Sequence, residues 1–137
     1  MQDELYAGGG AMTEAPRTIA GKLGTAFEDG DDDLFASLLD PAVRWGGEED
    51  TPETCHTREQ VLARYRQLRD GGVGATVEET ICLDDAVVLG LALSVPDDGP
   101  NPDLPPRVYQ VFRLADSLVV DIRGFPTREE ALAQAAG

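Results

Sequence analysis

The chain has 137 residues, of which 26 are acidic and 11 are basic, so its formal net charge is −15. This length fits one domain with a single core or one lined pocket. Because 42% of the residues are hydrophobic, the chain is too apolar for a disordered acidic tail, and we expect it to fold. A surface this negative repels phosphate groups and anionic lipid, which argues against nucleic acid and membrane surfaces as partners.

The start of the chain shows no secretory signal, because acidic residues are followed by an Ala-Gly run without an apolar core. The longest apolar stretch, 86–95, is about half of the roughly 20 residues that a membrane span needs. We therefore expect a cytoplasmic protein in which Cys55 and Cys82 are free thiols. Residues 1–17 are predicted to be a flexible N-terminal tail, with Met1 or Met12 as the start, and 18–137 a single domain.

The first half of the chain is predicted to be mainly helical. Helical spacing of apolar residues begins at Thr18 and ends at Gly30. A short second helix begins on the acidic run 31–33, which suits the positive end of a helix, and stops at Pro41. A short strand at 42–45 and a polar loop at 46–56 follow.

The second half is predicted to be mainly extended. Thr57 and Gln60 have the spacing of a capping box, which opens a third helix that ends at two glycines, 71 and 72. Thr127 and Glu130 repeat this spacing before a short C-terminal helix. Between these helices lie β-rich runs at 74–83, 86–95, 107–114 and 118–125. Helices gathered before an antiparallel run indicate an α+β fold.

The run at 86–95 has two unequal faces. Small residues dominate one face, which holds Val88, Gly90, Ala92 and Ser94. Large branched residues form the other, which holds Val87, Leu89, Leu91, Leu93 and Val95. We predict that the large-residue face packs on a second copy, giving a homodimer through the sheet face, and that the small-residue face leaves room for a pocket beneath the helices. The alternative is that both faces belong to one ordinary core.

Three segments together resemble the nuclear transport factor 2-like superfamily, and within it the SnoaL-like bacterial branch. They are 27–45, with its helix, Gly-Asp turn, helix and strand, 57–59 at the start of the third helix, and 112–132 at the end of the chain. The resemblance covers about residues 18–136. It implies a cone-shaped, cystatin-like α+β fold, in which a curved antiparallel sheet wraps around a long helix with a pocket at the wide end, and frequent dimers through the sheet.

The catalytic acids of two enzyme groups in this superfamily are missing here. Ketosteroid isomerases use an Asp base with a Tyr and a protonated Asp as donors. The matching positions are Trp45, Leu23 and Gln110. Limonene epoxide hydrolases use an Arg and two Asp residues. The matching positions are Ala92, Ser94 and Gly124. The resemblance thus predicts the fold well and the reaction poorly.

Four residues are predicted to bind a ligand: Trp45, Tyr65, Gln110 and Ser94. Trp45 is a stacking surface for a flat ligand or a core anchor. Gln110 and Tyr65 offer an amide and a phenol to one space, where they bind a ligand carbonyl or hydroxyl or are satisfied by hydrogen bonds within the core. Ser94 lies on the small-residue face.

His56 and Asp121 are the candidate catalytic residues. His56 could act as an acid or a base, but it lies on a loop, where a surface histidine is the plainer interpretation. Asp121 shares a strand face with charged residues and is taken as part of a surface network, unless the register shifts by one residue and makes it the pocket acid. We expect no metal, because no further histidine joins Cys55 and His56, and no cofactor.

Two functions remain open on these observations. One is a SnoaL-like small-molecule pocket protein, an isomerase, cyclase or dehydratase acting on an apolar metabolite or a binder of one, with a nearly uncharged pocket. The other is a non-catalytic dimeric scaffold or protein-interaction module on the same fold.

Overall fold

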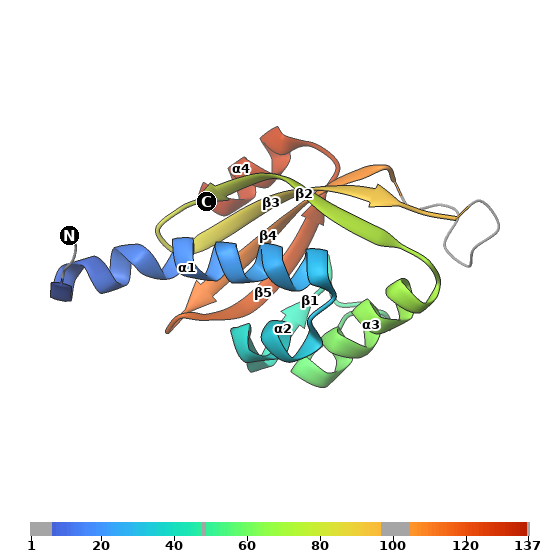
Figure 1. Ribbon diagram of the computed structural model, residues 1–137, viewed down its shortest axis with the longest axis horizontal. Helices are drawn as coiled ribbons and strands as arrows, with labels where there is room; N and C mark the ends of the chain where they lie inside the picture. Colours follow the sequence, from blue (N-terminus) through green and yellow to red (C-terminus); the bar gives the residue numbers. More distant parts are fainter. Residues whose placement is uncertain (1–6, 48, 97–104, 137) are drawn as a thin grey trace.

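A computed structural model describes residues 7–47, 49–96 and 105–136 (Figure 1). Its four helices are α1 (Ala7–Asp29), α2 (Asp32–Leu38), α3 (Arg58–Asp70) and α4 (Arg128–Ala136). Its five strands are β1 (Leu39–Trp45), β2 (Gly74–Cys82), β3 (Ala86–Ser94), β4 (Arg107–Ala115) and β5 (Leu118–Phe125). No helix in these described ranges is long and apolar enough to cross a membrane.

The strands form one curved sheet in the order β1-β5-β4-β3-β2. Neighbours from β2 to β5 are antiparallel, whereas β1 pairs with β5 in parallel. The long helix α1 runs across one face of the sheet, α2 and α3 lie toward β1, and α4 packs on the other face (Figure 1). The predicted α+β fold, a curved sheet wrapped around a long helix, is confirmed.

Local capping explains where three helices begin. The Asp31 carboxylate accepts a hydrogen bond from the Leu34 amide at 3.1 Å and caps α2. The Thr57 hydroxyl accepts one from the Gln60 amide at 3.2 Å, and the Gln60 side chain accepts one from His56 N at 2.6 Å. The Thr127 hydroxyl accepts one from the Glu130 amide at 3.2 Å before α4. The threonine caps predicted for α3 and α4 are confirmed, whereas the return bonds differ from a full capping box, because Gln60 accepts from the residue before the cap and Glu130 accepts from the Thr127 hydroxyl.

Two boundaries differ from the prediction. Helix α1 begins at Ala7 rather than Thr18, so part of the segment predicted as a tail is helical, and residues 1–6 lie outside the described residues. Glycines and Pro16 disfavour a helix, so the local sequence does not indicate this extension. Strand β1 begins at Leu39, before Pro41, because β1 is an edge strand with a register shift, and such a strand tolerates a proline.

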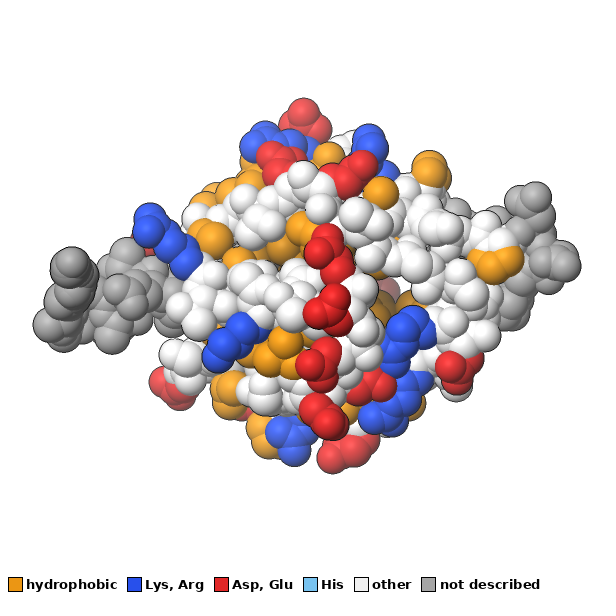
Figure 2. All heavy atoms as spheres, viewed as in Figure 1, with side chains coloured by type: hydrophobic (Ala, Val, Ile, Leu, Met, Phe, Trp, Pro, Cys, Tyr) orange, Lys and Arg blue, Asp and Glu red, His pale blue; other side chains and the backbone are white. Residues whose placement is uncertain are grey.

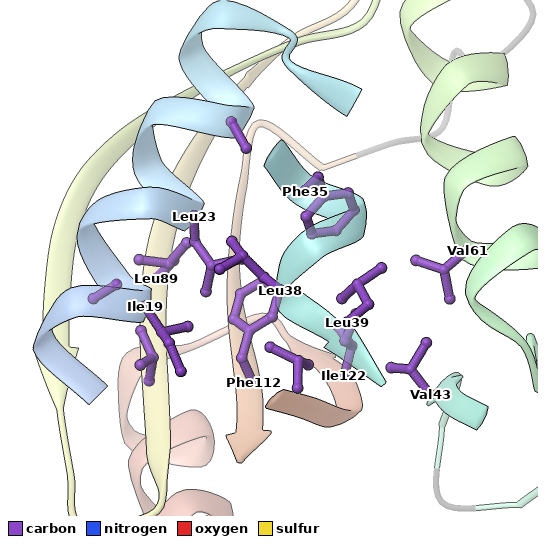
Figure 3. Packing of buried hydrophobic residues seen from close by; sticks show 14 of the residues in the cluster. Ile19, Leu23, Phe35, Leu38, Leu39, Val43, Val61, Leu89, Phe112 and Ile122 are labelled. Atoms are coloured by element: carbon purple, nitrogen blue, oxygen red, sulfur yellow. The ribbon is translucent and has the colours of Figure 1, made fainter. Parts of the chain in front are cut away.

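The prediction for the two faces of β3 was wrong, because the faces are exchanged. The large side chains point toward α1, where Leu89 packs near Ile19 and Leu23 in the main core (Figure 3). The small-residue face packs under α4 in a second cluster, which contains Ala86, Val88, Val111, Ala131 and Ala135. Small residues on both sides let the helix approach the sheet closely. The large-residue face is therefore covered within the chain, and a second copy cannot pack on it.

Candidate functional site

A cavity of about 630 Å³ opens at one end of the main core. Its walls come from the end of α1, the start of α2, the inner side of α3 and strands β1 to β5. Sheet curvature leaves this space, because the helices that cover the concave face do not fill it. The volume lies within the range of roughly 300–1,000 Å³ that is typical of small-molecule sites.

Aromatic side chains form much of the inner wall. Tyr65 of α3 stacks on Trp45 of β1, with ring centroids 4.5 Å apart and planes at 14°. Its ring also meets Phe35 edge-on at 4.8 Å and lies 5.3 Å from Phe27. Three other elements, β1, α2 and α1, thus converge on Tyr65. Because Tyr65 stacks on the Trp45 indole and the Arg64 guanidinium lies over the same ring, 5.5 Å from its centroid, only the part of the ring that these two leave free can meet a ligand.

Tyr65 and Gln110 form the polar centre of the cavity. The Tyr65 hydroxyl donates a hydrogen bond to Oε1 of Gln110 at 3.1 Å, which joins α3 to β4. Burial raises the pKa of the Tyr65 phenol, against the opposing effect of this hydrogen bond, so the phenol stays protonated at neutral pH. Gln110 is only 7% exposed, and its NH₂ group donates no hydrogen bond within the described parts of the chain.

The mouth of the cavity is charged. Its outer lining includes Glu28 and Asp29 at the end of α1, Asp32 of α2 and Arg69 of α3. Figure 2 shows a row of acidic side chains on the face that carries α1 and α2, next to a group of basic ones. The expectation of a nearly uncharged pocket therefore fits the inner part of the cavity and fails at its mouth.

Asp32 is the charged residue at the mouth that is held by arginines. Its carboxylate accepts hydrogen bonds from Arg69 at 2.7 and 2.8 Å and from Arg66 at 3.1 Å. Burial by itself would raise the pKa of Asp32, but the two arginines outweigh it and lower the pKa. These bonds tie the start of α2 to the end of α3.

Comparison with known proteins now identifies the family. The SnoaL-like domain matches residues 22–122, which is most of the chain. The chain belongs to the SnoaL-like family. The resemblance to this branch of the nuclear transport factor 2-like superfamily is thereby confirmed. No curated protein matches the chain.

Solved structures show the same fold as this SnoaL-like protein. A Jannaschia sp. CCS1 protein, provisionally named a SnoaL-like polyketide cyclase, has a TM-score of 0.64 and 23% identity, over 98% of this chain and 96% of its own. A Kribbella flavida protein, provisionally named a ketosteroid isomerase, has a TM-score of 0.61 and 22% identity, over 85% of this chain and 87% of its own. An LEH-like epoxide hydrolase from M. tuberculosis has a TM-score of 0.61 and 16% identity, over 90% of this chain and 90% of its own. At these identities the likeness shows the fold alone.

The structure brings the four predicted ligand-binding residues of the SnoaL-like protein to one cavity. Trp45, Tyr65 and Gln110 line its inner part, and Ser94 lies exposed at the rim. The charged mouth was not predicted from the sequence. The available signal is that Glu28 and Asp29 lie just before a glycine that ends a helix, where acidic side chains are unfavourable.

The two candidate catalytic residues lie away from the cavity. His56 is exposed, and its Nε2 lies 3.7 Å from a carboxylate oxygen of Asp50. Asp121 lies on the outer face of β5, 3.2 Å from Arg123 and 3.6 Å from Arg44. The register that keeps Asp121 outside places Ile122 in the core beside it. Neither residue is among those that line the cavity.

The inner cavity therefore offers hydrogen bonding and little acid-base chemistry. Its polar groups are a neutral phenol and an amide, whereas the carboxylates that line it stand at the mouth. Within the described residues, no three His, Cys, Asp or Glu side chains gather into a group that could hold a metal ion.

Replacing Asp32 by asparagine is expected to lower the free energy of unfolding by about 1 kcal/mol at pH 7. The pKa of Asp32 is lowered below 3.8 in the folded protein, so the ion pairs stabilise the fold above that pH. This stabilisation is lost as the pH falls through the lowered pKa, and the difference between wild type and variant should then disappear. Urea unfolding of both proteins from pH 7 down to pH 3 measures this difference in the free energy of unfolding.

Asp33→Asn is the matched control, because Asp33 shares the first turn of α2 and has no arginine partner in the described structure. An equal loss of stability in both variants would mean that the helix dipole, and not the arginines, accounts for the effect of Asp32.

Proposed function

We propose that this SnoaL-like protein binds an apolar small molecule that carries a carbonyl or hydroxyl oxygen. The observation that supports this most is Gln110, which lines the cavity, is only 7% exposed and has an NH₂ group that donates no hydrogen bond within the described residues. This NH₂ group is not among the fully buried, unpaired polar atoms of the described residues, so a molecule in the cavity can reach it. A ligand oxygen would accept a hydrogen bond from it, because the Tyr65 hydroxyl already occupies Oε1 and so orients the amide.

The shape and lining of the inner cavity support an apolar ligand body. Besides the aromatic rings, the strands contribute Leu91, Leu93 and Val108 to the lining. The three structural relatives are named for a polyketide, a ketosteroid and an epoxide, which are organic compounds bearing oxygen. We assign binding and no chemical step, because His56 and Asp121 lie away from the cavity and the inner wall holds no carboxylate.

Binding is tested with benzophenone, progesterone and diphenylmethane as probes. Benzophenone or progesterone should raise the melting temperature, since a ligand at 100 times its Kd stabilises a protein by about 2.7 kcal/mol. Trp45 is the only tryptophan, so progesterone should also change the intrinsic fluorescence if it enters the cavity. No shift in melting temperature with any probe, and no saturable fluorescence change, would contradict the proposal.

The role of Gln110 is tested by comparing two probes that differ only in the carbonyl. Benzophenone should bind the wild type about tenfold more tightly than diphenylmethane, because it accepts one further hydrogen bond. In Gln110→Leu this difference should vanish while both probes still bind. Equal affinity of the two probes for the wild type would show that the amide does not recognise the ligand.

A further inference from the structure

We propose that the ligand of this cavity is an elongated molecule with its oxygen near the middle and an apolar arm on each side, as in a dialkyl or diaryl ketone. This inference rests on the proposed function, since it concerns the same cavity and the same amide. It adds the place of the oxygen along the ligand and a residue, Gly124, that makes room for one of the two arms.

The cavity crosses the sheet and touches every strand. From β1 to β2 its lining includes, in the order in which the strands lie side by side, Trp45, Gly124, Gln110, Leu91 and Ala75. Neighbouring strands lie about 4.8 Å apart, so these five extend over about 19 Å along the curved sheet. A cavity of about 630 Å³ drawn out over that width is long and narrow, which suits an elongated ligand.

Gln110 lies near the middle of this row. Its strand, β4, is the third of five, with β5 and β1 on one side and β3 and β2 on the other. Helix α3 packs on β1, and α1 packs on β2 and β3, so the amide lies between the areas that the two helices cover. A ligand oxygen that accepts a hydrogen bond from Gln110 therefore has cavity on both sides of it.

Gly124 keeps the side of the cavity toward β1 open. It pairs with Gln110 across the strands and lies on the same face as Ile122 of the main core, because the two are two residues apart. Among the described residues, a Cβ at Gly124 would have one atom within 4 Å, Cγ2 of Val108 at 3.4 Å. Its φ is not positive, so the backbone does not require a glycine there. The missing side chain leaves space directly beside the amide.

The side of the cavity toward β2 is apolar near the amide. Ala75 of β2 pairs with Leu93 of β3, and both line the cavity together with Leu91. A small residue between two leucines leaves room for a second apolar arm. One central amide with an apolar space on each side thus matches a ligand whose oxygen lies between two arms.

Two isomeric ketones test the position of the oxygen: 7-tridecanone, with a hexyl chain on each side of the carbonyl, and 2-tridecanone, with an undecyl chain on one side. Each side of the cavity spans two strand spacings, about 10 Å, which an undecyl chain exceeds and a hexyl chain does not. By calorimetry, the wild type should bind 7-tridecanone about tenfold more tightly. In Gln110→Leu both ketones should bind equally, because no amide then fixes the carbonyl along the cavity.

Gly124→Val should weaken binding of 7-tridecanone about tenfold and change that of 2-tridecanone much less, because the long chain of the latter lies toward β2. Valine suits a strand, so the melting temperature should change little. Gly124→Ala adds a single carbon and should act in the same direction, by about twofold. The control Ala92→Val changes a strand residue outside the lining and should leave both affinities as in the wild type.

Equal binding of the two ketones to the wild type, or tighter binding of 2-tridecanone, would overturn this inference and leave the proposed function intact. The same holds if both Gly124 variants weaken the two ketones to the same extent, or if Ala92→Val acts as Gly124→Val does. Failure of both ketones to bind the wild type would contradict the proposed function, and the inference with it.

Discussion

Replacing Tyr65 by alanine is expected to lower the free energy of unfolding by about 3–5 kcal/mol, the range for removing a buried aromatic ring. The ring contacts Trp45, Phe35 and Phe27, and its hydroxyl bonds Gln110, so four elements lose a common partner. Binding of benzophenone should be lost as well, because the amide is no longer oriented. Urea unfolding and calorimetry measure the two effects.

Tyr65→Phe separates the ring from the hydroxyl. It keeps the stacking and should cost only about 1 kcal/mol of stability, while it weakens benzophenone binding by releasing the Gln110 amide. Tyr109→Phe is the matched control, because Tyr109 packs on the outer face of the sheet near α4. It should leave binding unchanged. A loss of stability below about 1 kcal/mol in Tyr65→Ala would contradict the central role of this ring.

Filling the cavity is expected to weaken ligand binding by about 100-fold without unfolding the protein. Ala75 lines the cavity from β2, where it pairs with Leu93, and Ala75→Phe places a ring in that space. Displacing the ligand from about 110 Å² of apolar surface corresponds to about 2.7 kcal/mol, or two orders of magnitude in Kd. A phenylalanine suits a strand, so the melting temperature should change little.

Ala92→Phe is the control for this variant. Ala92 lies on the neighbouring strand β3, on the parity of its small-residue face, and is absent from the cavity lining. The same substitution there should leave benzophenone affinity as in the wild type. If Ala75→Phe also binds benzophenone normally, the ligand occupies another site, and the assignment of the cavity is wrong.

Much of the secondary structure follows from short stretches of sequence. The starts of α3 and α4 were predicted because Thr57 and Thr127 each lie three residues before a residue whose amide they cap. Such bonds form within one helical turn, so a few residues encode them. The start of β1 was missed, because Pro41 ends a helix locally but is tolerated in an edge strand, and edge position is a property of the sheet.

The faces of β3 show what periodicity leaves open. Alternation along 86–95 separates large from small residues correctly, but it carries no information on which side a helix will lie. The large side chains meet α1, and the small ones meet α4. Both helices are far from β3 in sequence, so only their packing decides which face is inside.

By itself, the sequence determined the α+β fold class, the family and the residue types able to bind a ligand. The tertiary structure decided how those residues meet. Tyr65 and Gln110 are 45 positions apart and share one hydrogen bond, and Glu28 reaches β2 across 49 positions. Local hydrogen bonding and hydrophobic period are written in neighbouring residues, whereas a cavity is the space left when distant elements pack, so its lining appears only in the folded chain.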